Sequence, residues 1–348
     1  MTQISLKSVA KNFPRFSLGP VDFEVKSGEF FGIFGPPSSG KTSILKAILG
    51  LLPIDGGTIA FDGQDIADLP VESRNVAMVF QNLSLFPHMT GRENIIYPLI
   101  ERNFAKDEIE RRLAEVAEVL HISHILHKNP SQMSGGERQR IGLGRAFIGD
   151  SRAILMDEPI AALDARLREE MRVELKRLQR EKNQTFIYVS HDEEEVLAIS
   201  DRVAIIIDGK IEQVGTPSEV YDRPANMAVA RLIGSPPMNF FNGLGNASAG
   251  TFSSEKLNAI VPVAGIPSGE ITLGVRPEDL HISDQGIAGK VLTLEPLGSY
   301  TIINAEIGGQ PVKIRASGQV SMAEGASINV APDTRHIHLF GTDGKRIG

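Results

Sequence analysis

The sequence of 348 residues contains no cysteine and no hydrophobic stretch of membrane-spanning length. The absence of cysteine excludes disulfides, thiolate metal sites and cysteine nucleophiles, and it is compatible with a reducing compartment. A membrane-spanning helix needs about 18 consecutive apolar residues, which no stretch approaches. The opening residues MTQISLKSVA lack the basic segment and apolar core of a secretory signal peptide. We therefore expect a cytoplasmic protein that meets a membrane only through a partner.

The sequence also lacks an excess of positive charge. Its formal net charge is −7, which makes it a poor candidate for binding duplex DNA or anionic lipid, so we expect no nucleic-acid partner. Hydrophobic residues make up 41% and charged residues 23% of the chain, as is typical of soluble globular proteins. A chain of this length is long for one hydrophobic core, which favours two domains.

The first two-thirds of the sequence alternates short apolar runs with amphipathic helical patterns. A β-rich run at 29–35 ends in glycine and is followed by helical spacing at 43–52. Amphipathic helices are predicted at 105–122 and 165–182. Four more buried strands are expected in RNVAMVFQ, SRAILMDEP, TFIYVSHD and DRVAIIIDG. Buried strands separated by helices predict an α/β domain with a largely parallel sheet.

The composition changes at the segment IGSPPMNFFNGLGNASAG, which is rich in glycine, proline, serine and asparagine. Such a segment is typical of a linker, and we place a domain boundary there that separates residues 1–235 from residues 236–348. Beyond it the segments are short, β-rich and separated by glycines. They predict a small all-β barrel or sandwich of roughly 110 residues.

The segment FGPPSSGKTS fits the pattern G-x-x-x-x-G-K-[ST], with Gly35, Gly40, Lys41 and Thr42 at the fixed positions. In such a loop the backbone N–H groups surround a phosphate, and the following helix adds the positive end of its dipole. The lysine reaches the outer phosphates and the hydroxyl ligates magnesium. A plain turn is the alternative, but the segment follows a predicted strand and opens a predicted helix. That context favours nucleotide binding.

Two acidic residues, Asp157 and Glu158, end the apolar run ILMDEP. An aspartate at a strand end can hold the hydration shell of magnesium, and the next carboxylate can orient or deprotonate an attacking water. Two solvated acids would be the simpler interpretation of the run by itself. Together with the phosphate loop, the pair indicates a magnesium–nucleotide site.

The order of the motifs resembles that of an ATP-binding-cassette (ABC) ATPase. After the phosphate loop come VFQNLSLFPHMT, MSGGERQR, ILMDEP, AALDARLR and YVSHDEEE. They are similar to the family's glutamine loop, signature motif, Walker B strand, D-loop and switch histidine. The resemblance covers about residues 3–235. It implies an α/β P-loop NTPase fold, an ABC nucleotide-binding domain with a helical subdomain at about 82–150, and ATP and Mg²⁺ as cofactors.

The resemblance also implies that ATP lies between two subunits, so that the active unit is a dimer with two shared sites. Phe13 is similar to the aromatic residue that stacks on adenine, with Phe16 a nearby rival. Asp164 resembles the D-loop aspartate at the dimer seam, and the signature motif would bind the γ-phosphate of the other subunit's ATP. The implied nucleotide-binding residues are Phe13, Gly35, Pro36, Ser38, Ser39, Gly40, Lys41, Thr42, Ser43, Ser134, Gly135, Gly136 and Asp164.

Three residues carry the catalytic roles that the resemblance implies. Glu158 would assist the attack of water, His191 would contact the γ-phosphate as the switch histidine, and Gln81 would sense magnesium and contact the membrane partner. The implied Mg²⁺ residues are Thr42, Gln81 and Asp157. The signature departs from the commoner SGGQ form because Glu137 stands in place of glutamine, a difference compatible with a diverged subunit that pairs with a second, different ATPase.

The segments EQVGTP, EVYDRPAN, LGVRPEDL and HLF extend the resemblance over nearly the whole chain. They are similar to ATPase subunits of bacterial carbohydrate importers of the maltose and glycerol-3-phosphate type, which carry a C-terminal OB-like regulatory domain. This implies uptake of a sugar, polyol or sugar phosphate at the cytoplasmic face of the inner membrane. The implied partners are two transmembrane permease subunits, a second ATPase subunit and, indirectly, an extracytoplasmic solute-binding protein.

Other functions are compatible with parts of this pattern. An importer of polyamine, iron or sulfate would carry the same ATPase motifs, because the ATPase never touches the cargo. A soluble cassette ATPase acting on ribosomes or DNA usually has fused cassettes or long coiled insertions, which this sequence lacks. A P-loop small-molecule kinase would have neither the SGG signature nor the switch histidine.

Overall fold

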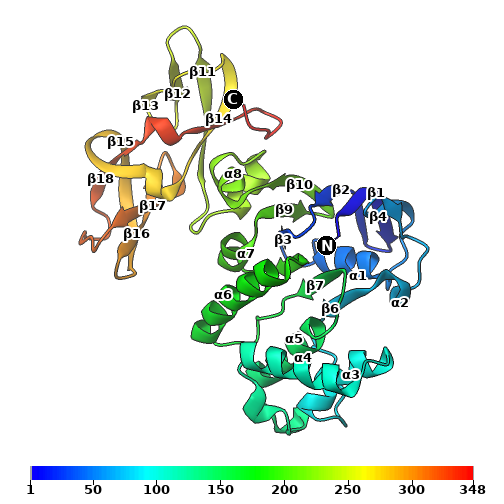
Figure 1. Ribbon diagram of the computed structural model, residues 1–348. Coiled ribbons are helices and arrows are strands. Elements are labelled where there is room, and N and C mark those ends of the chain that lie inside the picture. Colours follow the sequence, from blue (N-terminus) through cyan, green and yellow to red (C-terminus); the bar gives the residue numbers. More distant parts are fainter. Residues whose placement is uncertain (1, 348) are drawn as a thin grey trace. The chain divides into compact units, whose positions relative to one another are not determined.

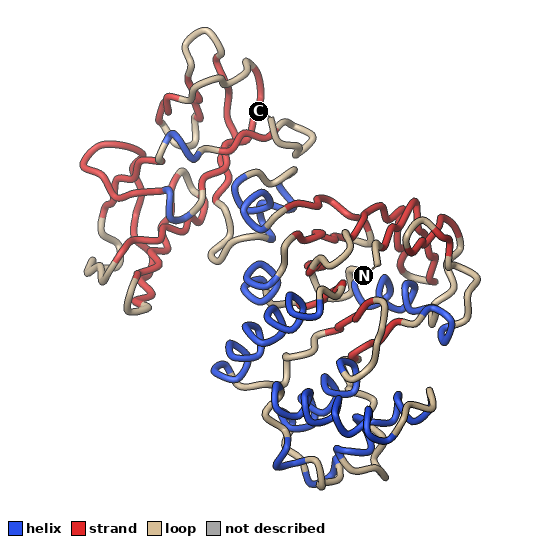
Figure 2. Tube along the Cα trace, in the orientation of Figure 1, coloured by secondary structure: helices blue, strands red, loops and turns tan. Residues whose placement is uncertain are grey.

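The computed structural model describes residues 2–347, and the chain divides into two compact units after Pro217. The first unit combines strands and helices, while the second consists mainly of strands (Figures 1 and 2). The division falls after the first residue of the short helix α8 (Pro217–Asp222), and the short helix α9 (Met227–Leu232) follows. Compactness groups α9 and nearly all of α8 with the β-rich unit. The domain boundary at 235/236 stays a prediction.

The centre of the first unit is a six-stranded sheet in the order β10-β9-β3-β8-β7-β6. The strands from β9 to β6 run parallel and β10 is antiparallel to β9. Strands β3, β7 and β8 are buried along their whole length, as expected for parallel strands covered on both faces. The six strands are β3 (Phe30–Phe34), β6 (Val76–Val79), β7 (Ala153–Asp157), β8 (Thr185–Ser190), β9 (Arg202–Ile207) and β10 (Lys210–Gly215).

A second, antiparallel sheet of the first unit has the order β2-β1-β4-β5. Its apolar side chains join α1 and the parallel sheet in one hydrophobic core that includes Leu18, Phe61, Ile33 and Ile48. The strands are β1 (Ile4–Phe13), β2 (Phe16–Val25), β4 (Gly56–Phe61) and β5 (Gln64–Asp65).

The helices of the first unit follow the amphipathic patterns of the sequence. Helices α3, α4 and α5 contact one another and lie together below the parallel sheet in Figure 1. Helix α7 packs against β3 so closely that a Cβ added at Gly32 would lie 2.5 Å from Val196 Cγ1. The helices are α1 (Lys41–Leu49), α2 (Val71–Arg74), α3 (Gly91–Glu101), α4 (Lys106–Val119), α5 (Gly135–Phe147), α6 (Ala165–Lys182) and α7 (Glu193–Ile199).

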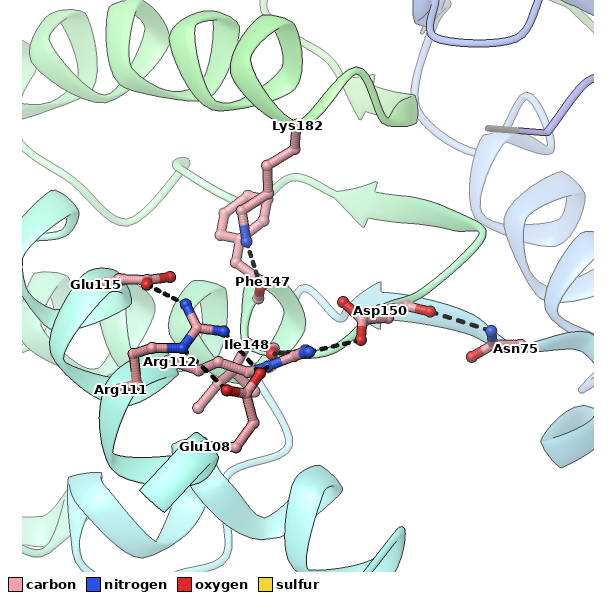
Figure 3. A network of polar contacts seen from close by, with 9 residues as sticks. All are labelled: Asn75, Glu108, Arg111, Arg112, Glu115, Phe147, Ile148, Asp150 and Lys182. Carbon is pink, nitrogen blue, oxygen red and sulfur yellow. Dashed lines mark hydrogen bonds and ion pairs between the residues drawn. The ribbon is translucent and has the colours of Figure 1, made fainter. Parts of the chain in front are cut away.

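Polar contacts connect the helices α4 and α6 to the end of α5 and to the loop that follows it (Figure 3). Arg112 on α4 pairs with Asp150 at 2.8 Å and with Glu108 at 2.6 Å. Lys182, the last residue of α6, donates to the Phe147 carbonyl at 3.1 Å. The hydrogen bonds of Arg111 and Arg112 lower the pKa of Glu108 to about 2. The charged side chains of Arg112 and Lys182 therefore hold α4 and α6 to the end of α5 and the loop after it.

The second unit contains two antiparallel sheets that share one hydrophobic core. Phe252 and Leu273 of the five-stranded sheet pack in the same cluster as Ile303 and Ile314 of the four-stranded sheet, which confirms the predicted all-β domain. The sheets have the orders β13-β12-β11-β14-β19 and β17-β16-β15-β18. The strands are β11 (Asn239–Asn246), β12 (Thr251–Ser254), β13 (Ala259–Pro262), β14 (Gly269–Val275), β15 (Leu280–Pro296), β16 (Tyr300–Ile307), β17 (Gln310–Ser317), β18 (Ser327–Pro332) and β19 (His338–Phe340).

A buried arginine holds the short helices of the second unit to its strands. Arg276 is only 2% exposed. It donates to the carbonyl of Tyr221 at 2.5 Å and to that of Ile233 at 2.8 Å. Its guanidinium carbon also lies 3.6 Å from the centre of the Tyr221 ring. One side chain thus joins the end of β14 to α8 and to the end of α9. Within residues 2–347, no helix is both long and apolar enough to cross a membrane.

Candidate active site

Three loops that carry predicted site residues leave the parallel sheet at one edge. Phe34 at the end of β3 is paired in register with Ser190 at the end of β8, and Asp157 at the end of β7 is paired with Val189. The phosphate loop, Glu158 and His191 follow directly after these strands. The carboxyl ends of parallel strands are where open α/β sheets bind their ligands. The register therefore brings together residues that are more than 100 positions apart.

The phosphate loop curls around the amino end of α1. Lys41, the first residue of this helix, is buried and donates to the carbonyls of Gly35 and Pro36, each at 2.8 Å. Gly40 has a φ of 105°, in the left-handed region that favours glycine. Burial lowers the pKa of Lys41, against the raising effect of nearby carboxylates. The buried Ser39 Oγ has no hydrogen-bond partner among the described residues, as expected where a polar ligand completes the loop.

Asp157 closes the inner side of this loop. Its side chain is almost fully buried, and its Oδ1 accepts a hydrogen bond from Thr42 Oγ1 at 3.1 Å. Burial raises the pKa of Asp157, while the bond from Thr42 opposes that rise. The pair presents one hydroxyl and one carboxylate beside the phosphate loop. These are the hard oxygen ligands that Mg²⁺ prefers alongside the phosphates of a nucleotide.

Glu158 lies between two of the other predicted residues. Its Oε2 accepts from Gln81 Nε2 at 2.9 Å, and its Oε1 lies 2.9 Å from His191 Nδ1. Its backbone N–H donates to Val189 across the end of the sheet at 2.8 Å. Glu158 also has a φ of 51°, which is uncommon for a residue with a side chain. Strained backbone of this kind concentrates at functional sites.

A cavity of about 540 Å³ unites most of the predicted residues. Both Phe13 and Phe16 line it, with ring centroids 6.0 Å apart and planes at 29°. Either ring is therefore placed where it could stack on adenine, and the stacking role of Phe13 stays a prediction. The lining residues are Phe13, Phe16, Pro37, Ser38, Ser39, Gly40, Lys41, Thr42, Ser43, Gln81, Glu158 and His191.

The signature motif does not line this cavity. Ser134 caps α5, where its Oγ accepts from the Glu137 backbone N–H at 3.2 Å and Glu137 accepts from the Ser134 N–H at 2.6 Å. Glu137 also pairs with Lys128 at 2.8 Å, and these contacts lower the pKa of Glu137 to about 2. Glu137 therefore completes a capping box. Gly135 and Gly136 begin the helix behind it.

Asp164 also lies outside the cavity. It caps α6, where its Oδ1 accepts from the Leu167 N–H at 3.0 Å. A Cβ added at Gly136 would lie 3.0 Å from Leu163 Cδ2, so the segment before Asp164 runs beside the start of α5. The roles of the signature and of Asp164 in a dimer stay predictions.

The site can be compared with known proteins. Residues 18–161 match the ABC transporter family. A protein of Agrobacterium fabrum named sn-glycerol-3-phosphate import ATP-binding protein UgpC 3 is 40% identical over 357 residues, with 100% of both chains covered. The chain belongs to the ABC transporter family. This ABC protein is an ATP-binding ATPase, as the motifs predicted.

Further matches agree with both units of this ABC ATPase. Residues 273–340 match the TOBE domain, in agreement with the predicted OB-like fold. The UgpC protein of Cereibacter sphaeroides is 39% identical over 353 residues, with 100% of both chains covered. The dimeric structure of MJ0796, described as a bacterial ABC transporter cassette, has a TM-score of 0.57 and 29% identity. It covers 62% of this chain and 98% of its own. A second structure of that cassette, bound to ADP and Pi, matches equally.

Two residues at the site of this ABC ATPase were not predicted from sequence. Pro37 lines the cavity, although the motif leaves its position unspecified. Gln139 on α5 is 2% exposed, and its Nε2 donates to the Glu158 carbonyl at 3.5 Å. Gln139 lies among mostly apolar buried residues of α5, and its polar character in that pattern was the available signal. Gln139 thus connects the helix that begins at the signature motif to the backbone of Glu158.

Proposed function

We propose that this ABC ATPase powers uptake of a sugar, polyol or sugar phosphate through a bacterial importer. The observation that carries its ATPase part is Glu158, which lines the cavity and contacts both Gln81 and His191. Full-length similarity to proteins named for sn-glycerol-3-phosphate import supports the cargo class. The ATPase would act at the cytoplasmic face of the inner membrane, bound to two transmembrane permease subunits and served by an extracytoplasmic solute-binding protein.

Hydrolysis would proceed by in-line attack of water on the γ-phosphorus of ATP. Glu158 would accept a proton of that water while the water oxygen bonds to the γ-phosphorus. The bond between the γ-phosphorus and the oxygen that leaves with ADP would break in the same step. Lys41 and the N–H groups of the phosphate loop would hold the β- and γ-phosphates, and His191 would contact the γ-phosphate. Thr42, Asp157 and Gln81 would hold Mg²⁺, which neutralises phosphate charge when bound.

Two chains would share each ATP. Ser134, Gly135 and Gly136 lie outside their own cavity, which supports a site completed by the signature motif of a second subunit. That subunit is either another copy of this chain or a related ATPase. ATP binding would close the pair of subunits, and the surface near Gln81 would transmit this closure to the permeases as a conformational change. Hydrolysis would return the permeases to their starting conformation.

Replacing Glu158 with glutamine tests the chemical part of the proposal. The Glu158→Gln chain should lose about 10²- to 10⁴-fold in ATP turnover, because loss of a positioned base costs this much, while a fluorescent ATP analogue should still bind. Glu169→Gln, a change at an exposed carboxylate on α6, is the matched control. Undiminished turnover of Glu158→Gln would remove Glu158 from the mechanism.

Co-purification from membranes tests the transport part. The expected result is recovery of two multi-span proteins with the tagged chain, and their identity fixes the cargo class. Partners belonging to a polyamine, iron or sulfate importer would replace the carbohydrate assignment. Repeated recovery without any membrane protein would favour a cassette ATPase that acts outside transport.

A further inference from the structure

A buried carboxylate near the active site has no part in the mechanism described above. Glu195, in the first turn of α7, is 3% exposed. Its Oε2 accepts hydrogen bonds from Ser190 Oγ at 2.7 Å and from Tyr188 Oη at 3.1 Å. Arg168 on α6 contributes an ion-pair contact of 3.4 Å to Oε1. Buried carboxylates are rare unless they are paired, and this one has two hydroxyl donors and a guanidinium.

The contacts of Glu195 fix the chain on both sides of His191. Ser190 Oγ donates to Glu195 and also accepts the backbone N–H of Asp192 at 3.0 Å. A hydroxyl has one proton to donate and lone pairs to accept, so it can do both at once. The residues before and after His191 are thus joined through one hydroxyl held by Glu195. His191 itself lies 2.9 Å from Glu158 in the cavity.

Arg168 extends this arrangement to the segment before Asp164. Its guanidinium donates to the Leu163 carbonyl at 3.2 Å and lies 3.6 Å from the Asp192 carboxylate. Arg168 therefore contacts both sides: the Leu163–Asp164 segment and the carboxylates around His191. Its side chain is about one-third exposed, whereas Glu195 is buried, so Glu195 is the fixed member of the pair.

We propose that Glu195 is a positioning residue for ATP hydrolysis: it holds the Ser190–Asp192 loop so that His191 reaches the γ-phosphate, and through Arg168 it couples that loop to the Leu163–Asp164 segment. The inference rests on the proposed role of His191. It assigns to Glu195 no contact with ATP, because Glu195 does not line the cavity. Its effect is therefore on the rate of hydrolysis and not on nucleotide affinity.

Glu195→Gln is the variant that tests this role with the least change of shape. Both hydroxyls donate to Oε2, so the amide oxygen can keep these two bonds. The amide lacks the charge that attracts Arg168, however, and places an NH₂ donor where Oε1 faced the guanidinium. A small displacement of a catalytic group lowers turnover by roughly 10- to 100-fold, and we expect a fall in kcat within this range. The KM for ATP should change by less than about threefold, because the phosphate loop is untouched.

A double-mutant comparison shows whether the effect passes through His191. Single-turnover assays on the full-length chain should give a large loss for His191→Ala and no further loss for His191→Ala combined with Glu195→Gln. Ser190→Ala, which removes the bridging hydroxyl, should behave like Glu195→Gln and serves if that variant folds poorly. Glu181→Gln, which removes one partner of the exposed α6 pair Arg177–Glu181, should leave kcat unchanged.

The outcomes separate this inference from the function on which it rests. Normal turnover of His191→Ala would overturn the role of His191 itself. A slow His191→Ala with normal Glu195→Gln and Ser190→Ala would overturn only the positioning role. Full additivity of the Glu195 and His191 losses, or a rise in KM with unchanged kcat, would also overturn it, because Glu195 would then act by another route.

Discussion

Acid should destabilise the second unit through one buried histidine. His338, the first residue of β19, is 6% exposed, and its Nδ1 lies 3.2 Å from an Arg346 guanidinium nitrogen. Arginine can only donate, so Nδ1 accepts and the imidazole is neutral. Burial, with Arg276, Arg346 and His336 nearby, lowers the pKa of His338 from 6.5 to about 4.

The sign and size of the effect follow from this lowered pKa. Between pH 6.5 and pH 4 the unfolded chain binds a proton that folded His338 does not, so the free energy of unfolding falls as the pH falls through this window. The difference corresponds to about 3 kcal/mol at pH 4 and to almost nothing above pH 7. Below pH 4 His338 is protonated in the folded and in the unfolded chain, so the free energy of unfolding no longer changes with pH through this residue.

Guanidinium unfolding at pH 7, 5.5 and 4, followed by circular dichroism, measures this contribution. The wild-type chain should lose about 3 kcal/mol more than His338→Gln between pH 7 and pH 4, because the glutamine can accept from Arg346 but cannot titrate. Subtracting the two chains removes the effect of all other groups. His281→Gln, at an exposed histidine of the same unit, should match the wild type. Equal pH dependence of wild type and His338→Gln would refute the reasoning.

Two further substitutions test contacts described above. Arg276→Met should destabilise the second unit by about 2–5 kcal/mol, because one buried and one partly buried carbonyl lose their donor. Calorimetry should show a lower unfolding temperature, and an unchanged one would contradict the role of Arg276 in holding α8 and α9 to the strands. Glu137→Gln should preserve ATP turnover within about twofold and cost less than about 1 kcal/mol, since glutamine keeps the capping box and loses only the pair with Lys128. A tenfold change in turnover would show that the acidic residue has a catalytic effect.

The sequence predicted the helices well where both ends carry local signals. Helix α6 spans Ala165–Lys182, the predicted range, because Asp164 caps its start and Asn183 takes a left-handed conformation at its end. The pattern at 105–122 predicted a longer helix than α4, which ends at Val119. His121, with a φ of 52°, turns the chain there, and no sequence signal favoured a left-handed histidine.

The phosphate loop was also predictable, because its chemistry is local. Gly40, Lys41 and Thr42 are adjacent in sequence, and strand, loop and helix follow one another. The grouping of Gln81 and His191 around Glu158 could not be worked out from spacing. It depends on the order and register of parallel strands, which the sequence does not encode locally. The resemblance named these residues, but only the structure shows their contacts with one another.

The capping box of α5 bears on how one chain could serve another's ATP. Ser134 Oγ accepts the Glu137 N–H, and this contact uses only a lone pair of the hydroxyl, so the single proton of Ser134 can still be donated to a phosphate oxygen. Glu137 meanwhile accepts the Ser134 N–H and pairs with Lys128, so Lys128 partly neutralises the negative charge that Glu137 places beside the helix start. An acid in place of the usual glutamine is therefore compatible with binding an anion at Ser134, provided that Lys128 stays in place.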